Sequence, residues 1–354
     1  MRDLALFLAL CASGSAHAYE MRPASHSGGT HTLYAQRMLS VLMPSHYAML
    51  QNAESKVNAN VSALRFSMSR DDDYSVGTNN GESEVWMTVG ADTLCSSIAC
   101  TLIRTDGRGN LVETDAIFEL MFEWALTDNK ADSVSYNSSK RRPLLNTAIH
   151  EFGHTLGLKH ESGHFQVMGN AWNVVSTNGP LTESVFSEDS SEGLVSVYGT
   201  RSEALEDLSL YHWKRTGESE SYSNHGRVAV YAGSGTELTA VAAMDEPTYK
   251  VDAGDSIIVE MTAENRGQSR QTVSLGLYLS TNDTITTNDI LLDNRYITLS
   301  RDSPLTFKVT GIDLPDCLAS GSSWWIGAII DDDGSLSEKN EVNNAVYFAE
   351  LQVR

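Results

Sequence analysis

The sequence predicts two domains of different class, an α+β domain over residues 63–200 and an all-β sandwich over residues 241–354. In the first domain, strand-like stretches precede helical ones without regular alternation, which is typical of α+β proteins. In the second, short alternating stretches follow one another and turn residues separate some of them, which indicates a β-sandwich of roughly 100 residues. A chain of 354 residues is long enough for both domains.

The elements of the first domain follow from periodicity and turn residues. The preceding segment, residues 19–62, has a loose start and then a helical pattern from Leu33 to Val57 with a break at Pro44. After it we expect strands over 63–69, 84–90 and 110–120, and helices over 144–158 and 190–199.

The elements of the second domain are nearly all strands. Its apolar stretches include "DSIIVEMTAEN", "TVSLGLYLST", "LTFKVTGIDL", "SWWIGAIID" and "NAVYFAELQV". The polar residues 201–240 before it show no clear pattern, so we treat them as a connector or an extension of the first domain.

The first 18 residues have the pattern of a signal peptide. A short apolar run ends in Ser13-Gly14-Ser15, and Ala16-His17-Ala18 forms a cleavage site of the A-x-A type. We therefore expect cleavage after Ala18 and export to the extracellular space or periplasm. A lipid anchor at Cys11 is disfavoured because a bulky leucine precedes it.

The charge of the chain limits its partners. The formal net charge is −21 and the isoelectric point is about 4.8, so phosphate backbones are repelled and a nucleic-acid partner is not expected. No other apolar run is long enough to span a membrane.

Three cysteines remain after removal of the signal peptide. Cys95 and Cys100 are close enough in sequence to close a small disulfide loop in an oxidising compartment. A zinc ribbon would need a second such pair, which the sequence lacks. Cys317 is interpreted as a small buried apolar residue.

The stretch "AIHEFGHTLGLKH", residues 148–160, contains the residues with the clearest chemistry. On a helix, His150 and His154 lie on one face and can bind one ion. Zinc accepts histidine nitrogens, and a catalytic site keeps one position for water. Glu151 is placed to contact that water, take its proton and deliver it to the leaving amine.

A third ligand is predicted beyond the helix. Gly157 can end the helix in a left-handed conformation and let the chain return His160 to the same ion. The pattern H-E-x-x-H occurs by chance in roughly one chain in a hundred of this length. Requiring Gly157 and His160 makes chance several hundred-fold smaller, so a bound metal explains the pattern better than coincidence does.

These residues resemble the metzincin zinc metalloproteases. In that group a methionine forms an apolar floor under the three histidines, the Met-turn, and Met168 takes this role by resemblance. The resemblance implies a catalytic domain with a twisted mixed sheet and helices, and one catalytic Zn²⁺. It also implies that residues 111–119 form the edge strand beside which substrate lies, and that the helix ending at Tyr198-Gly199 closes the domain.

Within this group the site is most similar to matrixins, by the interval from His160 to Met168. Glu161 is more similar to astacins, but Gly169-Asn170 stand where astacins and serralysins carry a tyrosine that contacts zinc. Residues 19–62 contain no cysteine, so a latent form would not depend on thiolate ligation. His164 is interpreted as a loop histidine, and His212 and His225 have no ligand spacing.

The second domain resembles the bacterial cell-adhesion-related module of the immunoglobulin-like class. The resemblance lies in Tyr278-Leu279-Ser280, Asp289 and the stretch from Glu338 to Asn344, and it implies a module that binds a surface or matrix ligand or acts as a spacer. Calcium is a second cofactor candidate at the acidic turns 71–73 and 331–333. Solvated turns without an ion are the alternative.

Together these features predict an exported zinc endopeptidase that acts on proteins or peptides. The main alternative is a non-catalytic surface or adhesion protein in which zinc braces the fold. Glu151 favours the protease, because a structural site has no need of it. A zinc amidase that hydrolyses non-peptide amides has the same ligands and stays open.

Overall fold

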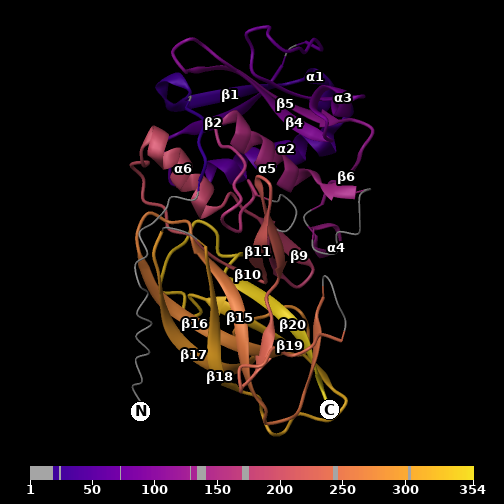
Figure 1. Cartoon of the computed structure of the whole chain (residues 1–354), viewed down its shortest axis with the longest axis vertical. Helices are drawn as coiled ribbons and strands as arrows, with labels where there is room; N and C mark the ends of the chain where they lie inside the picture. Colours follow the sequence, from indigo (N-terminus) through magenta and orange to yellow (C-terminus); the bar gives the residue numbers. More distant parts are fainter. Residues whose placement is uncertain are drawn as a thin grey trace.

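The computed structural model describes residues 19–23, 25–71, 73–127, 129–133, 141–169, 175–241, 246–301 and 304–354. The predicted signal peptide and Asp72 of the first acidic turn lie outside these residues. Among the described residues, no helix has both the length and the apolar character needed to span a bilayer. The chain forms an α+β domain and a β-sandwich, stacked along the long axis in Figure 1.

A five-stranded sheet in the order β2-β1-β3-β5-β4 supports the first domain. Its first four strands are parallel, and β4 runs antiparallel beside β5. Their bounds are β1 (Thr30–Ala35), β2 (Arg65–Arg70), β3 (Glu84–Thr88), β4 (Ala99–Thr105) and β5 (Leu111–Glu119). The predicted edge strand 111–119 is therefore wrong, because β5 is buried between two neighbours and β4 forms the edge.

The strand β1 occupies an interior position in the sheet that the sequence pattern does not predict. Leu33 belongs to this strand and not to a helix, and its side chain points into the core in alternation with exposed neighbours. Two helices follow, α1 (Arg37–Leu42) and α2 (Pro44–Asn58), the second with Pro44 in its first turn. Residues 30–58 thus share a sheet and a hydrophobic core with the rest of the first domain. The expected domain boundary at residue 63 therefore lies inside this one core.

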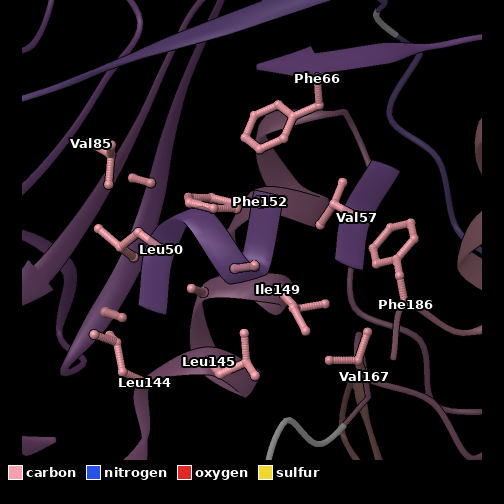
Figure 2. Packing of buried hydrophobic residues seen from close by; sticks show 14 of the residues in the cluster. Leu50, Val57, Phe66, Val85, Leu144, Leu145, Ile149, Phe152, Val167 and Phe186 are labelled. Atoms are coloured by element: carbon pink, nitrogen blue, oxygen red, sulfur yellow. The ribbon is translucent and has the colours of Figure 1, made fainter. Parts of the chain in front are cut away.

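The helices α2 and α5 (Leu144–Thr155) pack against each other and form the core together with the sheet. Helix α2 buries Leu50 and Val57 on one face, whereas α5 is buried on all sides. Figure 2 shows these side chains clustered with Ile149, Phe152 and others. This packing holds the helix of the H-E-x-x-H motif in one position.

Shortening Ile149 to valine is expected to destabilise the first domain by about 0.5–1.5 kcal/mol. Its side chain has no exposed area and lies in the main core, so the lost methylene leaves unfilled space. Chemical denaturation measures the change. The matched control is Val41→Ala on α1, where the side chain is 54 % exposed and a change within about 0.5 kcal/mol is expected. Equal effects of the two changes would contradict the packing described here.

Short elements complete the first domain. The predicted disulfide between Cys95 and Cys100 is present and joins α3 to β4, with a Cα–Cα distance of 5.7 Å. The predicted closing helix is α6, whose N-terminus is capped by Ser187. The bounds are η1 (Ser27–Gly29), α3 (Ala91–Cys95), β6 (Glu123–Ala125), α4 (Lys130–Ser133), β7 (Arg141–Pro143), β8 (Val175–Asn178), β9 (Leu181–Ser184) and α6 (Glu188–Tyr198).

The second domain is the predicted sandwich of two sheets. One sheet has the order β14-β20-β19-β16-β17, and in the other β15 pairs with β10, β13 and β18. Apolar residues such as Leu275 and Ile326 form its core. The bounds are β14 (Thr248–Val251), β15 (Ser256–Asn265), β16 (Gln271–Ser280), β17 (Ile290–Leu299), β18 (Leu305–Asp313), β19 (Ser323–Ile330) and β20 (Ala345–Val353).

Cys317 does not fit its predicted burial. It lies in a turn between β18 and β19 and is exposed. The prediction was wrong because the chain crosses the surface at this turn, where even an apolar side chain has few neighbours.

The segment 201–240 links the two domains physically. It contributes β10 (Leu208–Tyr211) and β13 (Val230–Ala232) to the sandwich, so the sandwich begins before residue 241. Between them, β11 (Trp213–Ser219) and β12 (Tyr222–Arg227) form an antiparallel hairpin. Figure 1 shows this hairpin extending from the sandwich toward α5.

Direct contacts also connect the domains. Lys130 Nζ lies 2.6 Å from a carboxylate oxygen of Asp283 and 2.9 Å from one of Glu246. The side chain of Asn178 accepts a hydrogen bond from the backbone N–H of Ile285 and donates one to its carbonyl. The two domains therefore meet through specific polar contacts, and the hairpin is held between them.

Candidate metal centre

The helix α5 carries His150, Glu151 and His154 on a rigid support. All three side chains are at most 9 % exposed. The helix ends at Thr155, and Gly157 adopts a φ of 99°, as predicted. The backbone N–H of Leu158 then bonds to the carbonyl of Gly153, which reverses the chain and brings His160 back to the helix.

The three predicted histidines meet in space. One ligand atom from each of His150, His154 and His160 lies within 4.8 Å of the others, and no other such group of metal-ligating side chains occurs among the described residues. The Nε2 atoms of His150 and His154 are 3.1 Å apart. Helix periodicity brings the first two together, and the turn at Gly157 brings the third.

Hydrogen bonds orient each imidazole ring. The Nδ1 atoms of His150 and His154 lie 2.8 Å from the carbonyl oxygens of Val167 and Leu158, respectively. An Nδ1–H that donates to a carbonyl leaves the lone pair on Nε2, which is the atom each ring directs at its neighbours. The Nδ1 atom of His160 lies 3.2 Å from the hydroxyl oxygen of Ser221.

Burial keeps these rings neutral. It lowers the pKa of His150 to about 4, lowers that of His154 well below the usual value, and lowers that of His160 to a smaller extent. A neutral imidazole presents a free lone pair, whereas a protonated one cannot bind a cation. Three converging neutral nitrogens fit the donor set of a zinc site with an open fourth position.

Glu151 follows His150 on α5 but is not part of the histidine group. Burial raises the pKa of its carboxyl to about 7, and a hydrogen bond from Thr101 opposes that increase. The Thr101 hydroxyl, on the edge strand β4, lies 2.8 Å from Glu151 Oε2 and 2.9 Å from its backbone carbonyl. A carboxyl with a pKa near neutrality can exchange a proton with a reacting group.

Met168 packs against the helix that carries His150 and His154, and its role as the Met-turn stays a prediction. It is 1 % exposed and packs directly against α5, because a Cβ at Gly153 would collide with its Sδ. A hydrogen-bond network fixes the turn before it: Gln166 donates to Asp189 on α6 over 2.7 Å and accepts from Ser190 over 2.9 Å. Helix α6 therefore supports the loop that orients His150.

The remaining histidines do not join the group. His164 lies 3.9 Å from Glu161, in the loop between His160 and Met168. His212 is buried against Tyr347, and the ring of His225 packs against Phe165. In the acidic turn 331–333, Asp331 accepts hydrogen bonds from Ser335 and Leu336, and calcium there stays a prediction.

The comparison with known families gives a match over this part of the chain. Residues 51–199 match the matrixin family of peptidases. This segment is a matrixin-like domain. The match contains the three histidines, Glu151 and Met168, and the resemblance inferred from the motif is confirmed. No curated protein matches the chain.

Solved structures similar to part of the chain are CARDB domains. One from Pyrococcus furiosus, solved with two metal ions, is 19 % identical and covers 30 % of this chain and 79 % of its own, with a TM-score of 0.23. A solution structure of that domain is 17 % identical and covers 43 % and 100 %, with a TM-score of 0.24. A Methanosarcina acetivorans domain is 18 % identical and covers 29 % and 78 %, with a TM-score of 0.20.

Three residues that contact the site are not predicted by the sequence pattern. Thr101 comes from the edge strand of the matrixin-like domain, whereas Ser221 and Tyr222 come from the β11–β12 hairpin beyond it. The Tyr222 hydroxyl lies 2.8 Å from His160 Nε2. No spacing rule connects these residues to the motif, because tertiary structure alone brings them there.

Proposed function

We propose that the protein is a secreted zinc-dependent endopeptidase that hydrolyses peptide bonds of proteins. The observation that supports this best is the convergence of three imidazole nitrogens beside the buried carboxyl of Glu151. The match of residues 51–199 to the matrixin family of peptidases supports the same activity. Export after Ala18 is part of the proposal, supported by the apolar leader and by the disulfide.

In this proposal His150, His154 and His160 hold the metal and Glu151 moves the proton. Zinc, when bound, supplies a Lewis acid that polarises the scissile carbonyl and lowers the pKa of water. Ionised Glu151 accepts the proton of the attacking water and then gives it to the leaving amine. Thr101 holds the carboxylate in place through its hydroxyl.

The edge strand β4 is the expected support for the substrate. Among the described strands, β4 pairs on one side only, so its other side can add an extended peptide by backbone hydrogen bonds. Thr101 lies on this strand and touches Glu151, so a peptide bound along β4 passes the reacting groups.

A structural zinc brace is the alternative from another class. A structural site binds four protein ligands and has no use for an ionisable carboxyl beside them. The presence of Glu151 at the site, with a pKa of about 7, therefore favours catalysis.

The direct test is cleavage of denatured casein by the mature protein from residue 19. We expect the zinc-loaded protein to cleave casein, the chelated protein to be inactive, and added zinc to restore cleavage. Metal content is measured on each sample. One bound zinc without any cleavage of casein or of a mixed peptide library would support the structural brace.

Replacing Thr101 with valine is expected to move the acid limb of the pH–activity profile to higher pH. The Thr101 hydrogen bond lowers the pKa of Glu151, so its loss raises that pKa. Activity falls as pH drops through the pKa of the base, and a higher pKa shifts this fall upward. Profiles of kcat/KM against pH measure the shift. The control is Thr105→Val, because Thr105 lies on the same strand and its side chain is exposed. An unchanged acid limb would contradict the role given to Thr101.

A further inference from the structure

The β11–β12 hairpin is built into both domains. At its base, Trp213 is 4 % exposed and belongs to the core of the matrixin-like domain. Along its length, Arg215 donates a hydrogen bond to the carbonyl of Ser162 over 3.0 Å. The buried Ser223 fits against Gly169, where a Cβ would collide with its hydroxyl. The hairpin is thus fixed beside the Met-turn.

The end of this hairpin carries two side chains to one histidine. Ser221 contacts His160 Nδ1, and the Tyr222 hydroxyl lies 2.8 Å from His160 Nε2. The rings of Tyr222 and His160 have centroids 4.0 Å apart. The Tyr222 ring also lies nearly parallel to that of His150, at 6.5 Å. The phenol therefore faces the histidine group, although its side chain is 40 % exposed on the outer side.

The contact between Tyr222 and His160 concerns the lone pair that would bind the metal. The Nε2 lone pair of His160 can accept the phenolic proton or bind a cation, but not both. Once a cation takes that lone pair, the phenolic oxygen stays at the same edge of the ring, held by a hairpin fixed at its base. The phenolic oxygen therefore lies on the side of His160 that carries the lone pair expected to bind the metal.

We propose that Tyr222 is a fourth ligand of the metal ion when substrate is absent, through its phenolic oxygen, with the phenolic proton passing to solvent. This inference rests on the proposed function, because it requires the metal at the three histidines. It means that the segment after the matrixin-like domain completes the metal centre. A peptide carbonyl or water must displace this oxygen for hydrolysis to begin.

Copper(II) provides a readout independent of activity. A phenolate bound to copper gives a charge-transfer absorption in the visible region that histidine ligands alone do not give. The full mature chain is stripped of metal, loaded with one equivalent of copper, and its spectrum is recorded beside that of Tyr222→Phe. We expect the band in the wild type and its complete loss in the variant, with equal copper content in both.

The control is Tyr296→Phe, which alters a tyrosine on β17 that is 70 % exposed and should keep the band. Phenylalanine keeps the ring of residue 222 against His160, and thermal melting checks that the variant folds. Copper-loaded wild type without the band, or a band that persists in Tyr222→Phe, would overturn the proposal. If the copper-loaded wild type shows the band but the zinc-loaded wild type does not cleave casein, the proposed function is refuted. Tyr222 would then still be a metal ligand.

Discussion

Replacing Glu151 with glutamine is expected to reduce kcat for casein cleavage by about 10²–10⁴-fold. Glutamine has nearly the same shape and can still accept the Thr101 hydrogen bond, but it cannot take up a proton. Because Glu151 is not in the histidine group, zinc content should equal that of the wild type. The loss then reflects proton transfer and not loss of the metal.

The matched control for this change is Glu82→Gln, which removes an exposed carboxylate in the turn before β3. It should leave kcat unchanged. Cleavage and metal content are measured on the same preparations. If Glu151→Gln retained most of the activity with full zinc, another group would have to be the base, and the assignment of Glu151 would fail.

Replacing His154 with alanine is expected to abolish tight zinc binding and all zinc-dependent cleavage. Its Nε2 atom lies 3.1 Å from that of His150, and two histidines alone make an incomplete site. A ligand that binds only the folded state stabilises it, by about 2.7 kcal/mol at a concentration of 100 times Kd. Zinc should therefore raise the melting temperature of the wild type and leave that of His154→Ala unchanged.

The measurement is thermal unfolding of metal-free protein with and without added zinc, combined with metal content after dialysis. His46→Ala on α2 is the control, because His46 is not in the histidine group and should not alter the zinc-dependent shift. A His154→Ala protein that retains one zinc and the full shift would place the ion elsewhere.

The metal-site residues could be predicted from the sequence because their geometry is local. His150 and His154 are one helical turn apart on any helix. Gly157 takes the positive φ that a reversal requires, so His160 returns within a few residues. The disulfide follows from a separation of five residues, and the sandwich from alternating strands with turn residues.

The errors concern features that depend on neighbours distant in sequence. The apolar residues in β5 do not indicate which strand pairs with it. In the structure β4 pairs with β5 and forms the edge, which residues 111–119 were expected to do. Leu33 fits a helical pattern with later residues, but pairing with β2 and β3 makes it part of an interior strand. Cys317 is apolar in character, yet its place in a turn exposes it.

The sequence by itself therefore determined the residues proposed for the centre: three histidines as metal ligands, Glu151 as the base and Met168 as an apolar support. Only the tertiary structure decided what surrounds them. Thr101 reaches Glu151 across 50 residues, and Tyr222 reaches His160 across 62. The physical reason is that helical periodicity and turn conformation act over a few residues, whereas the pairing of strands and the docking of a hairpin depend on burial summed over the whole chain.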